Sequence, residues 1–309
     1  DVDRSRGLGD VYKRQLLCTD KGLVNLGMVT DLVSHLGNDA ALTIFDGTPE
    51  NPTQMAVEEA VAAYQEADCD GVVALGGGSS MDLAKAVALA VTHEGDLLQY
   101  TAGLGGAGKI GTVAPLIAIP TTSGTGSEVS SGAVIIMNNG EKLILASRNL
   151  VPMTSICDPS LTLGLPPLLT AATGMDAMTH CIEALLSPQI NPPAEAVACD
   201  GIERGIREGN LVKAVKDGAD KDARWNMMMA AAEGAMGFSK GLGSVHSMSH
   251  ACGADQSLRL HHGTLNAVIL PTILDFNRDH VGDKYTRLNA AMGLCLLYTS
   301  PSPRDLSTS

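Results

Sequence analysis

An aspartate and a histidine stand four residues apart in TGMDAMTHCIEA, residues 173–184. If this segment is helical, Asp176 and His180 lie one turn apart on the same face. Such a pair can bind a metal ion through a carboxylate oxygen and an imidazole nitrogen, or it can be an ordinary hydrogen-bonded pair. Spacing alone favours the ordinary pair, because it arises by chance in many helices. A metal site would need further ligands elsewhere in the chain.

Four of the eight histidines lie in the segment SVHSMSHACGADQSLRLHHGTLN, residues 244–266: His246, His250, His261 and His262. Together with the Asp176 and His180 pair, this cluster can supply three neutral imidazoles and one carboxylate. That mixed set suits Fe²⁺ or Zn²⁺, whereas Mg²⁺ and Ca²⁺ prefer oxygen ligands throughout. The set contains no thiolate, which argues against a structural cysteine-type zinc site. A catalytic metal would keep one coordination position open for a substrate oxygen.

Two loops rich in small residues follow apolar, strand-like segments. In GVVALGGGSSMDLAKA, residues 71–86, three glycines separate a predicted strand from a helix N-terminus. Backbone N–H groups and the helix dipole favour a pyrophosphate there. The loop IPTTSGTGSE, residues 119–128, offers hydroxyls that suit phosphate or ribose. Each loop alone is also consistent with a structural turn, and neither is a GxGxxG or P-loop motif. Two such loops at strand ends of one sheet nevertheless indicate a dinucleotide site.

Asp20 directly follows the first predicted strand, residues 16–19. A carboxylate at this position can accept hydrogen bonds from ribose hydroxyls and repels a 2′-phosphate, so it favours NAD over NADP. In a standard dinucleotide-binding unit the acid follows the glycine turn, whereas here it precedes the turn. The sequence therefore predicts a variant of the Rossmann fold.

The elements that must position these groups change in character along the chain. Up to about residue 155, apolar segments alternate with helical patterns, which predicts a parallel sheet in a Rossmann-like α/β domain. Strands are predicted at 16–19, 41–45, 71–75 and 115–119, and helices at 54–67 and 76–91. The later segments have helical patterns. We expect an NAD-binding α/β domain over 16–155, an all-α metal-binding domain over 156–295, and the active site between them.

Composition restricts the class of protein further. Of the 309 residues, 45 % are hydrophobic and only 3 % are aromatic, which is enough for a full core of aliphatic side chains. The net charge of −13 argues against nucleic acid or an anionic membrane as a partner. No apolar stretch is long enough to predict a membrane span. The seven cysteines contain no CxxC pair and are expected to be reduced thiols of a cytoplasmic protein.

Both ends of the chain differ from the rest. Residues 1–15 are charged and aperiodic, and residues 296–309 are rich in serine and proline. We interpret both as non-native extensions that resemble translated adapter sequence, and ordinary disordered tails are the alternative.

In this order, the segments GGGSSMDLAK, IPTTSGTGSEVS, ATGMDAMTHCIEA and GLGSVHSMSHACG…HHGTLNAVILP resemble the iron-containing (group III) alcohol dehydrogenases. The similarity extends from Asp20 to about Gly293. It implies a dehydroquinate-synthase-like fold with NAD(P) bound by the first domain and a divalent metal, Fe²⁺ or alternatively Zn²⁺, bound by the second.

The resemblance also implies individual site residues. In the family, the last histidine ligand of the metal stands directly before a glycine, so the resemblance implies His262 and not His261 as this ligand. The implied metal ligands are Asp176, His180, His246 and His262. The implied cofactor contacts are Asp20, Asn51, Gly77, Gly78, Ser79, Asp82, Thr121, Thr122 and Lys142. The implied substrate contact is Phe238, and the implied catalytic proton relay is His250.

The resemblance implies an NAD-dependent alcohol dehydrogenase or aldehyde reductase for small alcohols, diols or hydroxy acids, compatible with a homo-oligomer. The metal would lower the pKa of the alcohol, the alkoxide would give hydride to the nicotinamide, and His250 would carry the proton towards water. One alternative is a sugar-phosphate cyclase of the dehydroquinate synthase type, which needs a cationic phosphate pocket. Another is an inert fragment, because the family's chain is expected to begin before residue 16 and to continue beyond residue 293.

Overall fold

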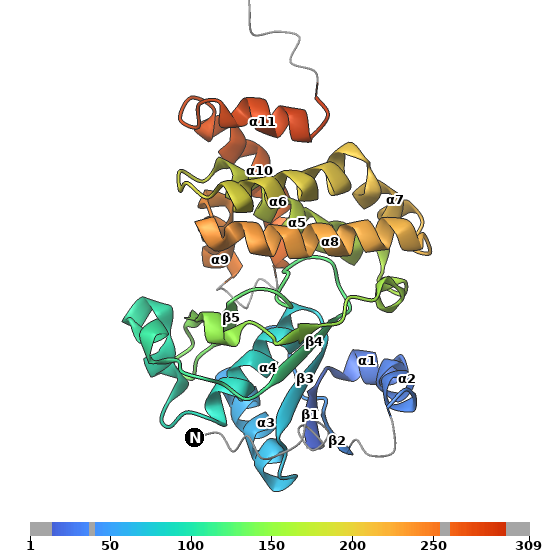
Figure 1. Ribbon diagram of the computed structural model, residues 1–309, viewed down its shortest axis with the longest axis vertical. Coiled ribbons are helices and arrows are strands. Elements are labelled where there is room, and N and C mark those ends of the chain that lie inside the picture. Colours follow the sequence, from blue (N-terminus) through green and yellow to red (C-terminus); the bar gives the residue numbers. More distant parts are fainter. Residues whose placement is uncertain (1–13, 37–40, 254–259, 295–309) are drawn as a thin grey trace, which may run out of the picture.

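The computed structural model describes residues 14–36, 41–253 and 260–294, which form an α/β half and a helical half (Figure 1). The strands are β1 (Arg14–Cys18), β2 (Ala41–Phe45), β3 (Gly71–Gly76), β4 (Leu116–Pro120), β5 (Gly132–Ile136), β6 (Lys142–Ala146) and β7 (Thr154–Ser155). The helices of the α/β half are α1 (Lys21–Asn25), α2 (Met28–Ser34), α3 (Gln54–Glu66) and α4 (Gly78–Ala90). Those of the helical half are α5 (Pro167–Leu186), α6 (Pro192–Ile202), α7 (Asn210–Lys216), α8 (Lys221–Gly237), α9 (Ser244–Gly253), α10 (His262–Asn277) and α11 (Lys284–Ala291).

Within the described residues, the main sheet is parallel and has the strand order β2-β1-β3-β4-β7. Successive residues point to opposite faces, so that Leu16 and Ala74 pack with α3 and α4, whereas Leu17 and Leu75 pack with α1 and α2. Figure 1 shows these two helix pairs on opposite sides of the sheet. Because both faces are covered, the strands are apolar runs without alternation, as the sequence prediction assumed.

A separate antiparallel hairpin of β5 and β6 lies between β4 and β7 in the chain. The sequence prediction had omitted it, although the chain carries a signal for it. Asn139 and Gly140 stand between two apolar runs, and Gly140 adopts the left-handed φ of 86° that such turns require. The hairpin places Lys142 at the edge of the α/β half that faces the helices.

Helix α5 is the central element of the helical half. It begins at Pro167, where a proline is favoured because the first helical N–H has no partner in the helix. Its buried side chains, among them Met178 and Ile182, share a core with α8 residues such as Met227 and Ala231. A helix surrounded on most sides by other helices holds its polar residues in fixed positions, which is what a metal site needs.

Several sequence expectations concern residues outside the described ranges. The predicted extensions, 1–15 and 296–309, lie there except for Arg14 and Gln15, which pair with β2 at the start of β1. Residues 254–259 of the histidine-rich segment lie there as well. In the described part of the chain, the cysteines are free thiols. No described helix has both the length and the apolar character of a membrane span.

Candidate active site

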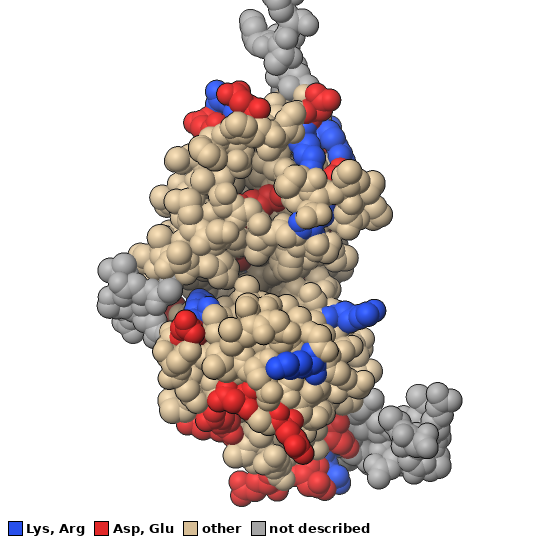
Figure 2. Space-filling model, turned by 90° about the vertical axis from the view of Figure 1, so that its left-hand side faces the viewer, with Lys and Arg blue, Asp and Glu red and all other residues tan. Residues whose placement is uncertain are grey.

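A cleft of about 870 Å³ lies between the two halves, and both contribute its walls. This volume is in the range of small-molecule binding sites. Figure 2 shows the molecule hollowed between its upper and lower parts. The predicted site residues that line the cleft are Asp20, Asn51, Gly77, Gly78, Ser79, Asp82, Thr121, Thr122, Lys142, Asp176, His180, Phe238, His250 and His262. His246 lies directly behind them with 1 % of its surface exposed.

The glycine turn forms the floor of the cleft on the α/β side. Strand β3 ends at Gly76 and α4 begins at Gly78, so the unpaired N–H groups of the first helical turn lie at the cleft. A Cβ atom on Gly78 would be only 2.6 Å from Cγ2 of Thr125, so the second loop can pack on the turn only because this residue is glycine. The same loop contacts the helical half, since a Cβ on Gly126 would be 2.3 Å from Cβ of Ala235 in α8. This arrangement fits a dinucleotide pyrophosphate bound at the turn.

Two charged residues of α4 hold the second loop and the start of β5 in place. Asp82 accepts hydrogen bonds from Ser127 Oγ at 2.6 Å and from the Val134 N–H at 2.8 Å. Lys85 Nζ donates to Ser127 Oγ and to the carbonyl oxygens of Ser130 and Gly132, each at 2.8 Å. Burial lowers the pKa of Lys85 to about 8. The structure thus shows Asp82 bound to neighbouring protein groups. The contact of Asp82 with the cofactor stays a prediction.

Four other predicted cofactor contacts have internal partners as well. Lys142 Nζ donates to Asn51 Oδ1 at 2.9 Å, which brings these two predicted contacts together. Asp20 caps α1 by accepting a hydrogen bond from the Leu23 N–H at 3.1 Å. Ser79 Oγ donates to the Glu50 carbonyl at 2.5 Å.

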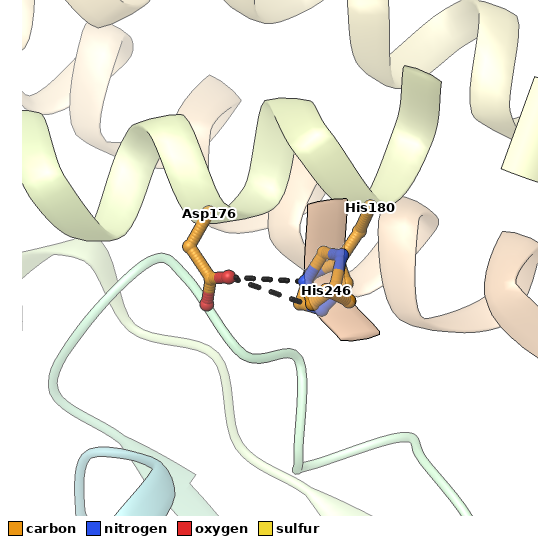
Figure 3. A group of neighbouring side chains, drawn as sticks. All are labelled: Asp176, His180 and His246. Carbon is orange, nitrogen blue, oxygen red and sulfur yellow. Dashed lines mark ion pairs between the residues drawn. The ribbon is translucent and has the colours of Figure 1, made fainter. Parts of the chain in front are cut away.

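The predicted metal ligands converge on one carboxylate oxygen. Oδ1 of Asp176 lies 4.0 Å from Nε2 of His180, 3.4 Å from Nε2 of His246 and 3.5 Å from Nε2 of His262. The rings of His180 and His246 are stacked, with centroids 4.4 Å apart (Figure 3). Three nitrogens around one oxygen form the donor set that suits Fe²⁺ or Zn²⁺. The residues present therefore fit the metal that the sequence predicts.

The protonation states in this cluster also suit a cation. Burial lowers the pKa of His180 to about 4 and that of His262 to about 3, so both imidazoles are neutral at pH 7. Burial acts in the same direction on His246, but hydrogen bonds to Asp176 and Glu183 outweigh it and raise the pKa to about 9. For Asp176, burial favours the neutral acid, yet the three histidines hold the pKa of this carboxyl well below its usual range. The cluster thus presents an ionised carboxylate and two neutral imidazoles.

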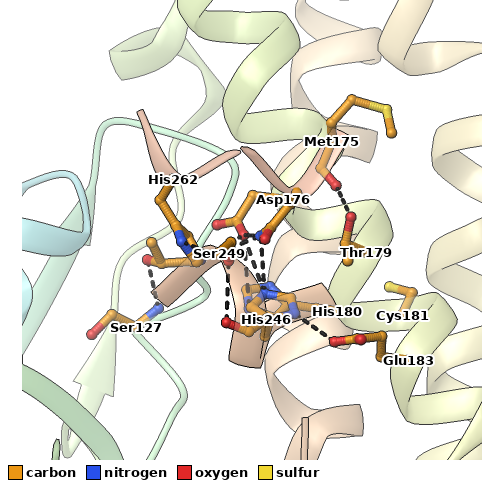
Figure 4. A network of polar contacts seen from close by, with 12 residues as sticks. Ser127, Met175, Asp176, Thr179, His180, Cys181, Glu183, His246, Ser249 and His262 are labelled. Atoms are coloured by element: carbon orange, nitrogen blue, oxygen red, sulfur yellow. Dashed lines mark hydrogen bonds and ion pairs between the residues drawn. The ribbon is translucent and has the colours of Figure 1, made fainter. Parts of the chain in front are cut away.

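Two polar residues beside these ligands were missed by the sequence prediction. Glu183 Oε2 accepts a hydrogen bond of 2.6 Å from His246 Nδ1 (Figure 4). Asn266 is fully buried, and its Nδ2 donates to Asp176 Oδ1 at 2.7 Å. A sequence signal existed for both, because Glu183 follows His180 by three residues and Asn266 follows His262 by four. In each case the helix brings the two residues onto one face.

The remaining histidines and the predicted substrate contact surround the cluster. The ring of His250 lies 4.7 Å from that of His262, and burial together with the nearby His246 and Lys142 lowers the pKa of His250 to about 4. The ring of Phe238 lies 5.0 Å from that of His180. His261 lines the cleft, and its buried Nδ1 has no hydrogen-bond partner among the described residues. The ion-pair geometry at Asp176 therefore supports the choice of His262 over His261.

Comparisons with known proteins give a consistent result for both halves. A family model described as iron-containing alcohol dehydrogenase matches residues 5–159. A second model, described as the C-terminal part of the Fe-containing alcohol dehydrogenase family, matches residues 170–304.

Individual relatives cover most of the chain. A 4-hydroxybutyrate dehydrogenase of Cupriavidus necator is 53 % identical over 290 residues, which are 91 % of this chain and 75 % of that protein. A 1,3-propanediol dehydrogenase of Klebsiella pneumoniae is 39 % identical over 91 % of this chain and 72 % of its own length. Among solved structures, a 1,3-propanediol oxidoreductase superposes with a TM-score of 0.86 at 36 % identity, over 94 % of this chain and 75 % of that one. A sulfoacetaldehyde reductase from Bifidobacterium kashiwanohense, solved with NAD⁺, superposes with a TM-score of 0.77 at 26 % identity, over 92 % of this chain and 79 % of that one.

Proposed function

The chain belongs to the iron-containing alcohol dehydrogenase family, and we propose that it interconverts a small ω-hydroxy acid, of the size of 4-hydroxybutyrate, and the corresponding aldehyde. It is an NAD-dependent oxidoreductase that acts on CH–OH groups. The identity of 53 % to the 4-hydroxybutyrate dehydrogenase supports the choice of a hydroxy acid over a simple alcohol. The observation that carries the proposal is one cleft that is lined both by the glycine turn and by Asp176, His180 and His262, with His246 directly behind them.

Each side chain has a defined task in this proposal. Asp176, His180, His246 and His262 would hold the divalent metal, which when bound acts as a Lewis acid that lowers the pKa of an alcohol. Gly77, Gly78 and the second loop orient the cofactor. Phe238 packs beside His180 and excludes water from that side of the cluster. His250 is neutral at pH 7 and accepts the alcohol proton on an imidazole nitrogen.

In this proposal His261 binds the substrate carboxylate. His261 lines the cleft and has a buried Nδ1 without a hydrogen-bond partner among the described residues. His261 can donate a hydrogen bond to a carboxylate oxygen of a hydroxy acid, and a simple alcohol has no such oxygen.

The described cysteines are free thiols and several of them are buried, which supports a reducing compartment, and we propose the cytoplasm.

The described cleft lining does not favour a sugar-phosphate cyclase. It holds two lysines, Lys21 and Lys142, against four carboxylates, Asp20, Glu50, Asp82 and Asp176. A substrate phosphate in addition to the cofactor pyrophosphate would have only these two lysines as cationic partners in the described lining.

Turnover measurements test the proposal. The purified chain is loaded with Fe²⁺ or Zn²⁺, and NADH formation is followed with 4-hydroxybutyrate, 1,3-propanediol and ethanol. We expect the highest kcat/KM for 4-hydroxybutyrate. An equal or higher kcat/KM for the diol would refute the hydroxy-acid assignment, and no turnover of any alcohol by metal-loaded protein would favour the inert fragment. Thermal melting with and without metal shows whether the protein was loaded.

A further inference from the structure

Glu183 lies in the same helix as two predicted metal ligands but contacts a third one in another helix. Asp176, His180 and Glu183 follow one another at intervals of four and three residues, so they share one face of α5. The side chain of Glu183 is 6 % exposed, and its Oε2 lies 2.6 Å from Nδ1 of His246 in α9. Helix α5 thus provides two ligands and also the group that contacts His246 from behind.

The same carboxylate also binds the start of α9. Oε1 accepts a hydrogen bond of 2.7 Å from the Val245 N–H, and Oε2 accepts one of 3.0 Å from the Gly243 N–H. These N–H groups have no carbonyl partner within the helix, and a negative charge at a helix N-terminus is favourable. A Cβ on Gly243 would be 2.5 Å from Oε1 of Glu183, so this approach requires glycine at position 243.

An ionised carboxylate accepts hydrogen bonds and does not donate them, which determines where His246 carries its proton. With Glu183 at Nδ1, the neutral imidazole has its proton on Nδ1 and its lone pair on Nε2. That Nε2 is the atom 3.4 Å from Asp176 Oδ1, on the side of the other ligands. Without the carboxylate, the ring would be free to take the other tautomer, in which Nε2 cannot bind a metal.

We propose that Glu183 is a positioning residue of the metal site: it selects the Nδ1–H tautomer of His246 and holds α9 against α5. Carboxylates that accept a hydrogen bond from a metal-binding histidine also raise its basicity. Their loss commonly weakens metal binding by roughly 10- to 100-fold. The inference rests on the metal site of the proposed function but is independent of the substrate.

Glu183→Gln is the test variant, because the amide keeps the size of the side chain and loses the charge. The matched control is Glu195→Gln. Glu195 is a second buried carboxylate of the helical half, 11 % exposed and paired with Lys240 and Arg287. Metal affinity is measured by titrating Co²⁺ or Zn²⁺ against a chromophoric chelator, and the ligand geometry by the visible absorption of the Co²⁺-loaded proteins.

We expect Glu183→Gln to weaken Co²⁺ and Zn²⁺ binding by roughly 10- to 100-fold and to change the Co²⁺ spectrum. Glu195→Gln should melt at a lower temperature with an unchanged metal Kd and spectrum. Equal affinity and an equal spectrum for Glu183→Gln and the parent protein would overturn the inference. Failure of the parent protein itself to bind metal would instead refute the metal site.

A second measurement covers the case in which Glu183→Gln does not fold. In the Zn²⁺-loaded parent protein with ¹⁵N-labelled histidine, we expect one strongly downfield imidazole Nδ1–H signal with a cross-relaxation peak to the Val245 amide. The absence of such a signal would also overturn the inference.

Discussion

Oδ1 of Asp176 and Nε2 of His246 face each other across 3.4 Å, although the two residues belong to different helices. The pKa of His246 is raised to about 9, so at pH 7 a proton on the imidazole compensates the carboxylates beside it. A metal ion that binds Nε2 has to replace this proton.

Metal binding should therefore release about one proton per site at pH 7 to 8. Isothermal titration of Zn²⁺ in two buffers of different ionisation enthalpy measures this number. His246→Ala should bind too weakly for a measurable heat and should lose NADH formation. Binding without proton release would contradict the charge assignment, and turnover by His246→Ala would contradict the metal mechanism.

His250→Gln should reduce kcat by roughly 10²-fold, because the neutral imidazole that accepts the alcohol proton is lost. The metal-dependent thermal shift should be unchanged, since His250 is not one of the four predicted metal ligands. His35→Gln, in an exposed position after α2, is the control and should keep full activity. An unchanged kcat for His250→Gln would assign the proton transfer to another group.

Asp20→Asn should increase the use of NADP relative to NAD. The amide can still cap α1 through the bond to the Leu23 N–H, but it no longer repels a 2′-phosphate. Removal of a repulsion of about 1 kcal/mol changes the ratio of the two kcat/KM values by roughly fivefold. Asp96→Asn, at a helix cap outside the cleft lining, should leave the ratio unchanged. A constant ratio in Asp20→Asn would remove Asp20 from the ribose site.

Glu128→Gln should change the pH dependence of stability. Glu128 is 2 % exposed, and burial raises its pKa from 4.5 to about 7, so between these values the folded protein holds a proton that the unfolded chain has released. This carboxyl therefore makes the free energy of unfolding fall as pH rises from 4.5 to 7. At pH 8 the variant should be more stable by up to about 3 kcal/mol, and at pH 4.5 the difference should vanish. Urea unfolding at both pH values measures it.

The exposed Glu66→Gln is the control for this series and should follow the parent protein at each pH. If the free energies of unfolding of Glu128→Gln and the parent protein differ by the same amount at both pH values, burial does not raise the pKa of the Glu128 carboxyl.

Four of the five parallel strands in the described sheet could be predicted because each is an apolar run bounded by residues that interrupt it, whereas β7 has only two residues and leaves no pattern. The predicted strand 41–45 is β2 unchanged, and the predicted strand 71–75 ends one residue before Gly76. The hairpin of β5 and β6 was not predicted because a local antiparallel pair does not follow the alternation of strands with helices. The Asn139-Gly140 turn was the signal that would have identified it.

Two kinds of site residue could be predicted from the sequence: residues that lie on one face of the same helix, and residues that match the family's motifs. Asp176 and His180 share a helical face, which spacing alone can indicate. The contact of Glu183 with His246 depends on how α9 packs against α5, and the contact of Asn266 with Asp176 depends on how α10 packs against α5. No periodicity in the sequence encodes such contacts between helices, so their partners became visible only in the folded chain.

The second loop packs through Thr125 on the glycine turn and through Gly126 on α8, so one short segment touches both halves of the molecule. Separation of the halves would break one of these two contacts. A dinucleotide that stabilises the loop on the glycine turn would therefore also stabilise its contact with α8. Such a linkage is reciprocal, so a change in the helical half that strengthens the contact with α8 would also strengthen dinucleotide binding.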